Sequence, residues 1–205
     1  VMFKKPIIAF EGIEGSGKSH HISIVSKFLE KKKIKHIKIR EPGGNPNSEK
    51  IRKLLLDNKS NFNMNTDLLL YMASRSENIT QIKKFYKKKV ILIDRFIDST
   101  IAYQHYGMGV DIKIIKFFNK YILKDIKLDF TFLNIVNNKN LILRLKQRKS
   151  LNRYDKFNIS FYNKVQNGYI KLSKIRKKKY KIINSNNDIK MNERLILDQV
   201  NRLIK

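Results

Sequence analysis

A short segment near the start of the chain constrains the fold more than any other. Residues 12–19, GIEGSGKS, match the pattern G-x-x-x-x-G-K-S/T without a mismatch. A short apolar run, IIAFE at residues 7–11, precedes the segment, and residues 17–33 follow with apolar side chains at helical spacing. In such a strand–loop–helix unit, glycines let backbone N–H groups turn inward and form an anion nest at the positive end of the helix dipole. The segment therefore predicts a phosphate-binding loop.

The side chains of this loop match the needs of a nucleoside triphosphate. Lys18 supplies a mobile cation for the β- and γ-phosphates, and Ser19 supplies a hydroxyl ligand for Mg²⁺. The alternative is a glycine-rich turn that fits the pattern by chance, but it does not account for the strand before the loop and the helix after it. We expect an ATP or GTP site, with the ATP contacts at Gly12, Ile13, Glu14, Gly15, Ser16, Gly17, Lys18 and Ser19.

Apolar segments alternate with helical patterns along the whole chain. Strands are expected at residues 7–11, 36–40, 90–94, 130–135 and 181–184. Helices are expected at residues 17–33, 48–57, 66–86, 112–123, 138–149, 159–177 and 191–204. Strands that are separated by helices pair in parallel through right-handed crossovers. We therefore predict one α/β domain over residues 1–205, a three-layer P-loop NTPase fold with a five-stranded parallel sheet flanked by helices.

The charge of the chain is large but diffuse. It carries 45 Lys and Arg against 17 Asp and Glu, a formal net charge of +28. Lysine recurs along the whole length beside many Ile and Asn residues, which is typical of coding bias toward A and T and indicates no specific nucleic-acid site, although a positive field would help to capture nucleotides. There is no cysteine and no apolar stretch near the roughly 20 residues that cross a bilayer, so we expect a cytoplasmic protein without membrane contact.

Two polar clusters follow predicted strands, at the edge where parallel α/β sheets bind their ligands. Residues 40–44, REPGG, come directly after the second strand, and residues 94–96, DRF, close the third. Asp94 ends an apolar strand, where a carboxylate can hold Mg²⁺ directly or through water. Arg95 has the planar guanidinium that suits two oxyanions at once. The alternative for this pair is a salt bridge between Asp94 and Arg95 at the strand end.

The ordered set of motifs resembles one enzyme family. The segments GIEGSGKS at 12–19, REPGG at 40–44 and DRF at 94–96, with the SxxAYQ pattern at 99–104, together resemble thymidylate kinases of the bacterial type. The resemblance runs from about residue 7 to about residue 170. It implies transfer of the γ-phosphoryl group of Mg·ATP to the 5′-phosphate of dTMP, which gives dTDP, a step in dTTP synthesis. It also implies a homodimer.

The resemblance further implies an acceptor site for dTMP. Tyr71 would lie against the pyrimidine face, and a core aromatic on a buried helix is the alternative for it. Arg75 would read a carbonyl edge of the base, and Tyr103 would crowd the 2′ position of the sugar, so that ribonucleotides bind poorly. The implied dTMP contacts are Glu14, Arg40, Arg52, Tyr71, Arg75, Arg95, Ser99, Tyr103 and Gln104.

Guanidinium groups would carry much of the implied chemistry. Arg40, Arg52 and Arg95 would surround the acceptor phosphate, with a solvated helix position as the alternative for Arg52. The segment at about residues 144–156 is dense in cations and resembles the lid of the bacterial enzymes. In that type the lid, rather than the phosphate-binding loop, provides an arginine to the transferring group. The implied catalytic residues are Lys18, Arg95, Arg148 and Arg153, and the implied metal ligands are Ser19 and Asp94.

Two other functions stay open on the sequence alone. A deoxynucleoside kinase of related fold would need a general base for a neutral 5′-hydroxyl, for which Glu11 or Glu14 is a candidate. The cluster of arginines argues against it, because a neutral acceptor has no phosphate for them to bind. A basic nucleic-acid-binding NTPase would show a localised basic stripe with interleaved aromatic residues, whereas the charge here is diffuse.

Overall fold

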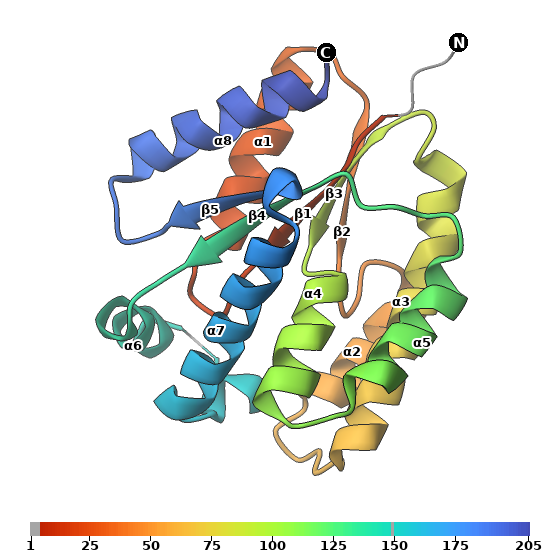
Figure 1. Cartoon of the computed structure of the whole chain (residues 1–205), viewed down its shortest axis with the longest axis vertical. Coiled ribbons are helices and arrows are strands. Elements are labelled where there is room, and N and C mark those ends of the chain that lie inside the picture. The colour runs from red at the N-terminus through yellow and green to blue at the C-terminus, as the bar shows by residue number, and fades with distance from the viewer. Residues whose placement is uncertain (1–4, 149) are drawn as a thin grey trace.

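The computed structural model describes residues 5–148 and 150–205. Parallel strands form one sheet in the order β2-β3-β1-β4-β5, which runs through the middle of the molecule (Figure 1). The strands are β1 (Ile7–Glu11), β2 (His36–Arg40), β3 (Val90–Asp94), β4 (Phe130–Ile135) and β5 (Tyr180–Asn184). The predicted five-stranded parallel sheet is confirmed.

Helices cover both faces of this sheet. The α-helices are α1 (Lys18–Lys31), α2 (Pro46–Leu56), α3 (Met64–Phe85), α4 (Ile97–Thr100), α5 (Ile112–Leu123), α6 (Asn138–Lys146), α7 (Ile159–Ile175) and α8 (Ile189–Leu203). In Figure 1, α1 and α8 lie on one face, and α3, α4, α5 and α7 lie on the other. The predicted three-layer α/β fold is therefore confirmed. Within the described ranges, no helix is both long enough and apolar enough to span a bilayer.

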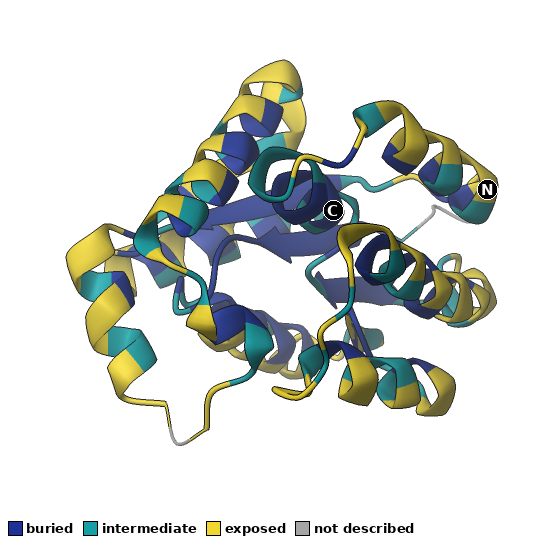
Figure 2. Ribbon diagram, turned by 90° about the horizontal axis from the view of Figure 1, so that it is seen from below, coloured by how far each residue is buried: buried dark blue, intermediate teal, exposed yellow. Residues whose placement is uncertain are grey.

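Alternate side chains of the central strands enter two separate cores. Ile8 and Phe10 of β1 pack toward α1 and α8, whereas Ile7 and Ala9 pack toward α3 and α5. Since strand side chains point to opposite faces in turn, β1 is buried on both sides, and Figure 2 shows the sheet as the buried centre of the molecule. This double burial explains why β1 and β3 are nearly continuous apolar runs in the sequence.

The main departure from the predicted elements lies after β3. Helix α4 continues directly into η1 (Ile101–Gly107), a π-helix, in a segment for which the sequence indicated no helix. Its wide turns place Tyr103 and Gln104 in buried positions, and π-helical turns of this kind are frequent at functional sites. Two 3₁₀ turns, η2 (Arg153–Lys156) and η3 (Lys177–Lys179), were also not predicted. The helix expected to reach residue 149 ends at Lys146, and Lys149 lies outside the described residues.

Candidate active site

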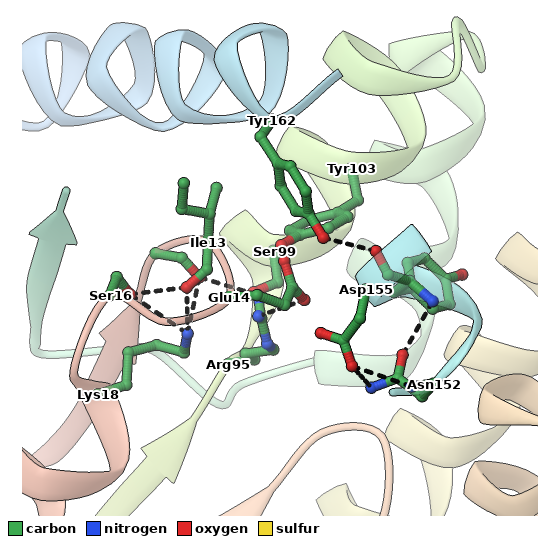
Figure 3. A network of polar contacts seen from close by, with 12 residues as sticks. Ile13, Glu14, Ser16, Lys18, Arg95, Ser99, Tyr103, Asn152, Asp155 and Tyr162 are labelled. Atoms are coloured by element: carbon green, nitrogen blue, oxygen red, sulfur yellow. Dashed lines mark hydrogen bonds and ion pairs between the residues drawn. The ribbon is translucent and has the colours of Figure 1, made fainter. Parts of the chain in front are cut away.

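The loop between β1 and α1 folds back around its own lysine. Gly12, Gly15 and Gly17 have φ angles of 138, 65 and 89°, a region that glycine enters at little cost. A Cβ atom on Gly12 would lie 2.3 Å from the carbonyl oxygen of Asn134, so a side chain cannot be accommodated there. Lys18 Nζ donates to two loop carbonyl oxygens at 2.8 and 2.9 Å, as Figure 3 shows. The loop at the head of α1 thus has the glycine-dependent conformation that is expected of a phosphate-binding loop.

The surroundings of Lys18 shift the pKa of its amine. Burial, together with the nearby Arg95 guanidinium, lowers the pKa of Lys18 to about 7, although the carboxylates of Asp94 and Glu14 act in the opposite direction. A phosphate group in the loop would favour the charged amine.

A cavity of about 230 Å³ opens beyond this loop, bounded by the ends of β2 and β3, helix α3, η1 and the lid. Most side chains proposed for the acceptor, the metal and the transfer step line it together. From the predicted sets these are Glu14, Lys18, Ser19, Arg40, Arg52, Tyr71, Arg75, Asp94, Arg95, Ser99, Tyr103, Gln104 and Arg148. Arg153 is not among the lining residues. Sequence positions that lie far apart are therefore gathered at one edge of the sheet, as the topology predicts.

Arg95 is fixed between the phosphate-binding loop and the cavity. Its Nη2 donates to Glu14 Oε1 at 2.8 Å and its Nη1 donates to the carbonyl oxygen of Gly12 at 2.9 Å. Figure 3 shows the guanidinium directed at Glu14, which also accepts the hydroxyl proton of Tyr103. The ion pair of Arg95 is thus with Glu14, so the alternative of an Asp94–Arg95 salt bridge is wrong. Arg95 has a φ of 65°, an uncommon value for a side-chain-bearing residue that is often found at functional sites.

Asp94 and Ser19 offer oxygen ligands to a divalent cation. Both line the cavity, and Asp94 Oδ1 is buried without a hydrogen-bond partner among the described residues. A buried oxygen without a hydrogen-bond partner destabilises the fold unless a ligand binds to it. Among these residues, no cluster of three or more His, Cys, Asp or Glu is arranged to hold a metal by itself. A site of this kind fits Mg²⁺, which commonly binds through one carboxylate together with phosphates and water.

Two further arginines reach the cavity from β2 and α2. Arg40 is half exposed and forms a bidentate pair with Glu49, whose Oε1 also accepts the backbone N–H of Gly44 at 2.8 Å. Arg52 Nη1 donates to the carbonyl oxygen of Pro42 at 2.7 Å. The helix position of Arg52 is thus not merely solvated, because its side chain is anchored at the cavity wall.

The far end of the cavity is lined by helix α3 and η1. Arg75 is 1% exposed and donates to Glu41, Asn119 and Thr100 at 2.8 to 3.0 Å. A buried guanidinium with these partners braces the wall, whether or not it also reaches a ligand. Gln104 Nε2 is buried and has no hydrogen-bond partner among the described residues. It is a donor that a ligand carbonyl would satisfy.

The lid closes one side of the cavity. Arg148 lines it and pairs with Asp155, whose carboxylate also accepts the backbone N–H of Asn152 at 3.0 Å. Figure 3 shows Asn152 and Asp155 facing the region of Arg95. Arg153, which does not line the cavity, pairs with Asp67 of α3. From the sequence Arg148 and Arg153 were equal candidates for the transfer step, and the structure distinguishes them.

The sequence analysis did not assign several lining residues, namely Glu41, Pro42, Leu56, Phe96, Thr100, Asn152 and Tyr154. Glu41 and Pro42 lie inside the REPGG segment, and Phe96 inside DRF, so the motifs themselves carried a signal for them. Tyr154 had no such signal, because it lies in a 3₁₀ turn without periodicity.

A buried carboxylate at the end of β1 gives the fold a pH dependence that can be measured. Glu11 accepts the backbone N–H of Phe96 at 2.9 Å and the hydroxyl proton of Ser99 at 2.5 Å. Burial, together with the charge of Asp98, raises the pKa of Glu11 from 4.5 to about 7. Between pH 4.5 and about pH 7, the Glu11 carboxyl group is protonated in the folded chain and ionised in the unfolded chain. The contribution of protonated Glu11 to the free energy of unfolding is therefore fully present below pH 4.5 and is lost as the pH rises through 7. This loss lowers the free energy of unfolding by roughly 3 kcal/mol.

We expect Glu11→Gln to remove this dependence. Glutamine keeps the shape and the acceptor oxygen but does not titrate, so between pH 5 and pH 8 the unfolding free energy of the variant should change less than that of the unaltered chain. Urea unfolding at the two pH values measures the difference. Glu77→Gln, at an exposed position of α3, is the matched control. The same pH dependence in all three proteins would contradict the expectation.

Among parallel α/β proteins, a loop of this geometry between the first strand and its helix defines the P-loop NTPase class. A sequence model of the thymidylate kinase family matches residues 10–196. The chain belongs to the thymidylate kinase family.

Individual relatives agree with this assignment. The thymidylate kinase of Thermosipho africanus is 42% identical over 171 residues, which cover 82% of this chain and 85% of that protein. The thymidylate kinase of Acholeplasma laidlawii is 36% identical over 197 residues, which cover 94% of this chain and 97% of that protein. The crystal structure of thymidylate kinase from Ehrlichia chaffeensis superposes with a TM-score of 0.76 at 28% identity, covering 97% of this chain and 99% of that one.

Proposed function

We propose that this chain transfers the γ-phosphoryl group of ATP to the 5′-phosphate of dTMP and so forms dTDP. The observation that carries the proposal is the cavity next to the phosphate-binding loop, which Arg40, Arg52 and Arg95 line together. Three guanidinium groups suit an acceptor that is already an anion, because each can bind phosphate oxygens with a pair of N–H groups. A neutral nucleoside would offer these guanidinium groups no phosphate to bind. This favours a monophosphate kinase over a deoxynucleoside kinase.

In this proposal the reaction depends on placing two phosphates end to end. Lys18 holds the donor phosphates, and Arg95, which lies between the loop and the cavity, contacts the acceptor and the transferring group. Ser19 and Asp94 would hold Mg²⁺, which neutralises charge on the donor phosphates when bound. Arg148 is the lid cation that we assign to transfer, because it lines the cavity whereas Arg153 does not. The acceptor phosphate is an anion, so no strong general base is required.

The other end of the cavity would receive the nucleoside. Tyr71 offers a ring face to the pyrimidine, and stacking of this kind contributes about 1 kcal/mol. The unpaired Nε2 of Gln104 would donate to a ring carbonyl. Tyr103, whose hydroxyl is bound to Glu14, would crowd the 2′ position and disfavour a ribose.

An acceptor panel tests this function. ADP release from ATP is measured with dTMP, dUMP, UMP and the ribonucleotide of thymine, and we expect the highest kcat/KM with dTMP. In parallel, thermal shifts are recorded with dTMP, thymidine and single-stranded DNA at two salt concentrations. Stabilisation by dTMP alone supports the proposal. Turnover of thymidine in preference to dTMP, or a salt-sensitive response to DNA alone, would replace it with one of the alternatives. A cytoplasmic location stays a prediction from the sequence.

We also propose that the chain forms a homodimer, as the family resemblance implies. Helix α5 presents Ile114, Phe117 and Tyr121 at a spacing that places them on one face, and they are 45, 66 and 71% exposed. An exposed apolar stripe of this kind is typical of a protein interface. We expect Phe117→Asp to shift the mass measured by light scattering from dimer to monomer. Lys116→Asp, a charge change on the same helix but outside this face, should leave the dimer intact, and a monomeric unaltered chain would contradict the proposal.

A further inference from the structure

The lid is tied to the wall of the cavity that lies opposite the phosphate-binding loop. Asp67 of α3 is 3% exposed and accepts hydrogen bonds from the Arg153 guanidinium and from the Tyr154 hydroxyl, the latter at 3.1 Å. A third link joins Asn58 Nδ2 to the carbonyl oxygen of Leu151 at 2.8 Å. These contacts fix the lid at the end of the cavity proposed for the base, while Arg144 Nη1 of the lid donates to the carbonyl oxygen of Gly15 in the phosphate-binding loop at 2.8 Å.

The same contacts place Tyr154 in the cavity wall. Its ring lies 6.1 Å from that of Tyr71 with an angle of 79° between the planes, and 6.1 Å from that of Tyr103 with an angle of 68°. Tyr154 is 3% exposed and lines the cavity. The guanidinium of Arg153 lies over its ring at 5.2 Å. Three tyrosines, from α3, η1 and the lid, thus form one corner, and two of them are those assigned to the base and the sugar.

We propose that Tyr154 forms a wall of the acceptor base site and that Asp67 is the positioning residue that holds it there. The inference rests on the proposed function, because it takes the base of the monophosphate to lie against Tyr71. A wall that is ordered in advance lowers the entropy cost of binding, since the lid side chain does not have to be immobilised by the ligand. Asp67 then affects the binding of the monophosphate and not that of ATP. It also gives Arg153 a role at the base end, away from the transferring phosphoryl group.

Fluorescence tests the wall directly, because the chain contains no tryptophan. In Tyr154→Trp the single indole should change its emission when dTMP is added and should not respond to ATP alone. Tyr86→Trp, near the end of α3 and away from the cavity, is the matched control and should not respond to either nucleotide. Calorimetry on the unaltered chain establishes separately that dTMP binds.

Kinetics test the positioning role. In Asp67→Asn we expect the KM for dTMP to rise about 5- to 10-fold, which corresponds to roughly 1 kcal/mol, while kcat and the KM for ATP stay within about twofold. Asp67→Glu keeps the charge and should restore most of the affinity. Asp198→Asn, at an exposed position of α8, should behave like the unaltered chain. Tyr154→Ala removes the wall and should lower the preference for dTMP over dGMP, whose base is larger.

The outcomes separate this inference from the proposed function. If dTMP neither binds nor is turned over, the proposed function is wrong and the inference falls with it. If dTMP binds but leaves the emission of Tyr154→Trp unchanged, or if Asp67→Asn raises the KM for ATP and for dTMP equally, only the inference is overturned. A shift in emission together with the selective rise in KM supports it.

Discussion

Turnover of dTMP by the Arg95→Ala variant is expected to fall by about 10³-fold, mainly through kcat. The guanidinium lies between Glu14 of the phosphate-binding loop and the acceptor cavity, where charge develops on the transferring group. Arg95→Lys should recover only a small part of the activity, because an ammonium group lacks the fork that contacts two oxygens at once. Steady-state kinetics with dTMP and ATP measure both variants.

A structural effect of Arg95→Ala is separated from a catalytic one by two measurements. Removal of the arginine leaves Glu14, which is buried, with Tyr103 as a partner, so some loss of stability is expected. Circular dichroism and the thermal midpoint show whether the fold persists. Arg194→Ala, at an exposed position of α8, should retain full activity. An Arg95→Ala variant that is folded and fully active would contradict the assigned mechanism.

Lys18→Ala is the second variant with a large expected effect, a fall in kcat/KM of roughly 10²- to 10³-fold. The amine lies within the loop, with carbonyl oxygens as its acceptors, and burial lowers its pKa to about 7. No acidic side chain depends on it for a salt bridge among the described residues. The fold should therefore tolerate the change, whereas a donor phosphate would lose the cation that the loop provides.

Lys27→Ala tests whether this effect is specific. Lys27 lies on the exposed face of the same helix, so the variant removes the same charge from a highly basic chain without touching the loop. Calorimetry with ATP and an assay of ADP release should show normal behaviour for Lys27→Ala and weak binding with slow turnover for Lys18→Ala. Equal losses in the two variants would mean that diffuse charge, rather than the loop, captures the nucleotide.

The sheet was predictable from the sequence because burial on both faces leaves a continuous apolar run. Residues 7–11 and 90–94 are such runs and became β1 and β3 with the same bounds. The segment that forms η1 carries no comparable signal. Residues 101–104 are four consecutive buried positions, so they lack the alternation of polar and apolar residues that marks a surface helix. A π-helix with this burial cannot be recognised from helical spacing.

The site residues were predictable where a backbone motif determines their positions. They were not predictable where positive charge was the only indication of function. Gly12 and Lys18 follow from the loop pattern, whose geometry tolerates few other residues. The lid contains several cations in similar sequence contexts, so no local pattern distinguishes Arg148 from Arg153. The partner that separates them, Asp67, lies 86 positions away from Arg153. Because a contact between residues so far apart forms only in the folded chain, no local sequence pattern indicates it.

The hydrogen bonds of Glu14 have a thermodynamic consequence for a reaction with two ligands. Glu14 belongs to the loop that would hold the donor, while its partners Arg95 and Tyr103 belong to the wall of the acceptor cavity. A ligand in the donor site that alters these hydrogen bonds also changes the free energy of the side chains in the acceptor cavity, and a ligand in the acceptor cavity has the same effect on the donor site. Linkage requires this influence to be mutual, so each nucleotide must change the affinity for its partner by the same factor. Cooperativity between the two substrates would then originate in a single carboxylate.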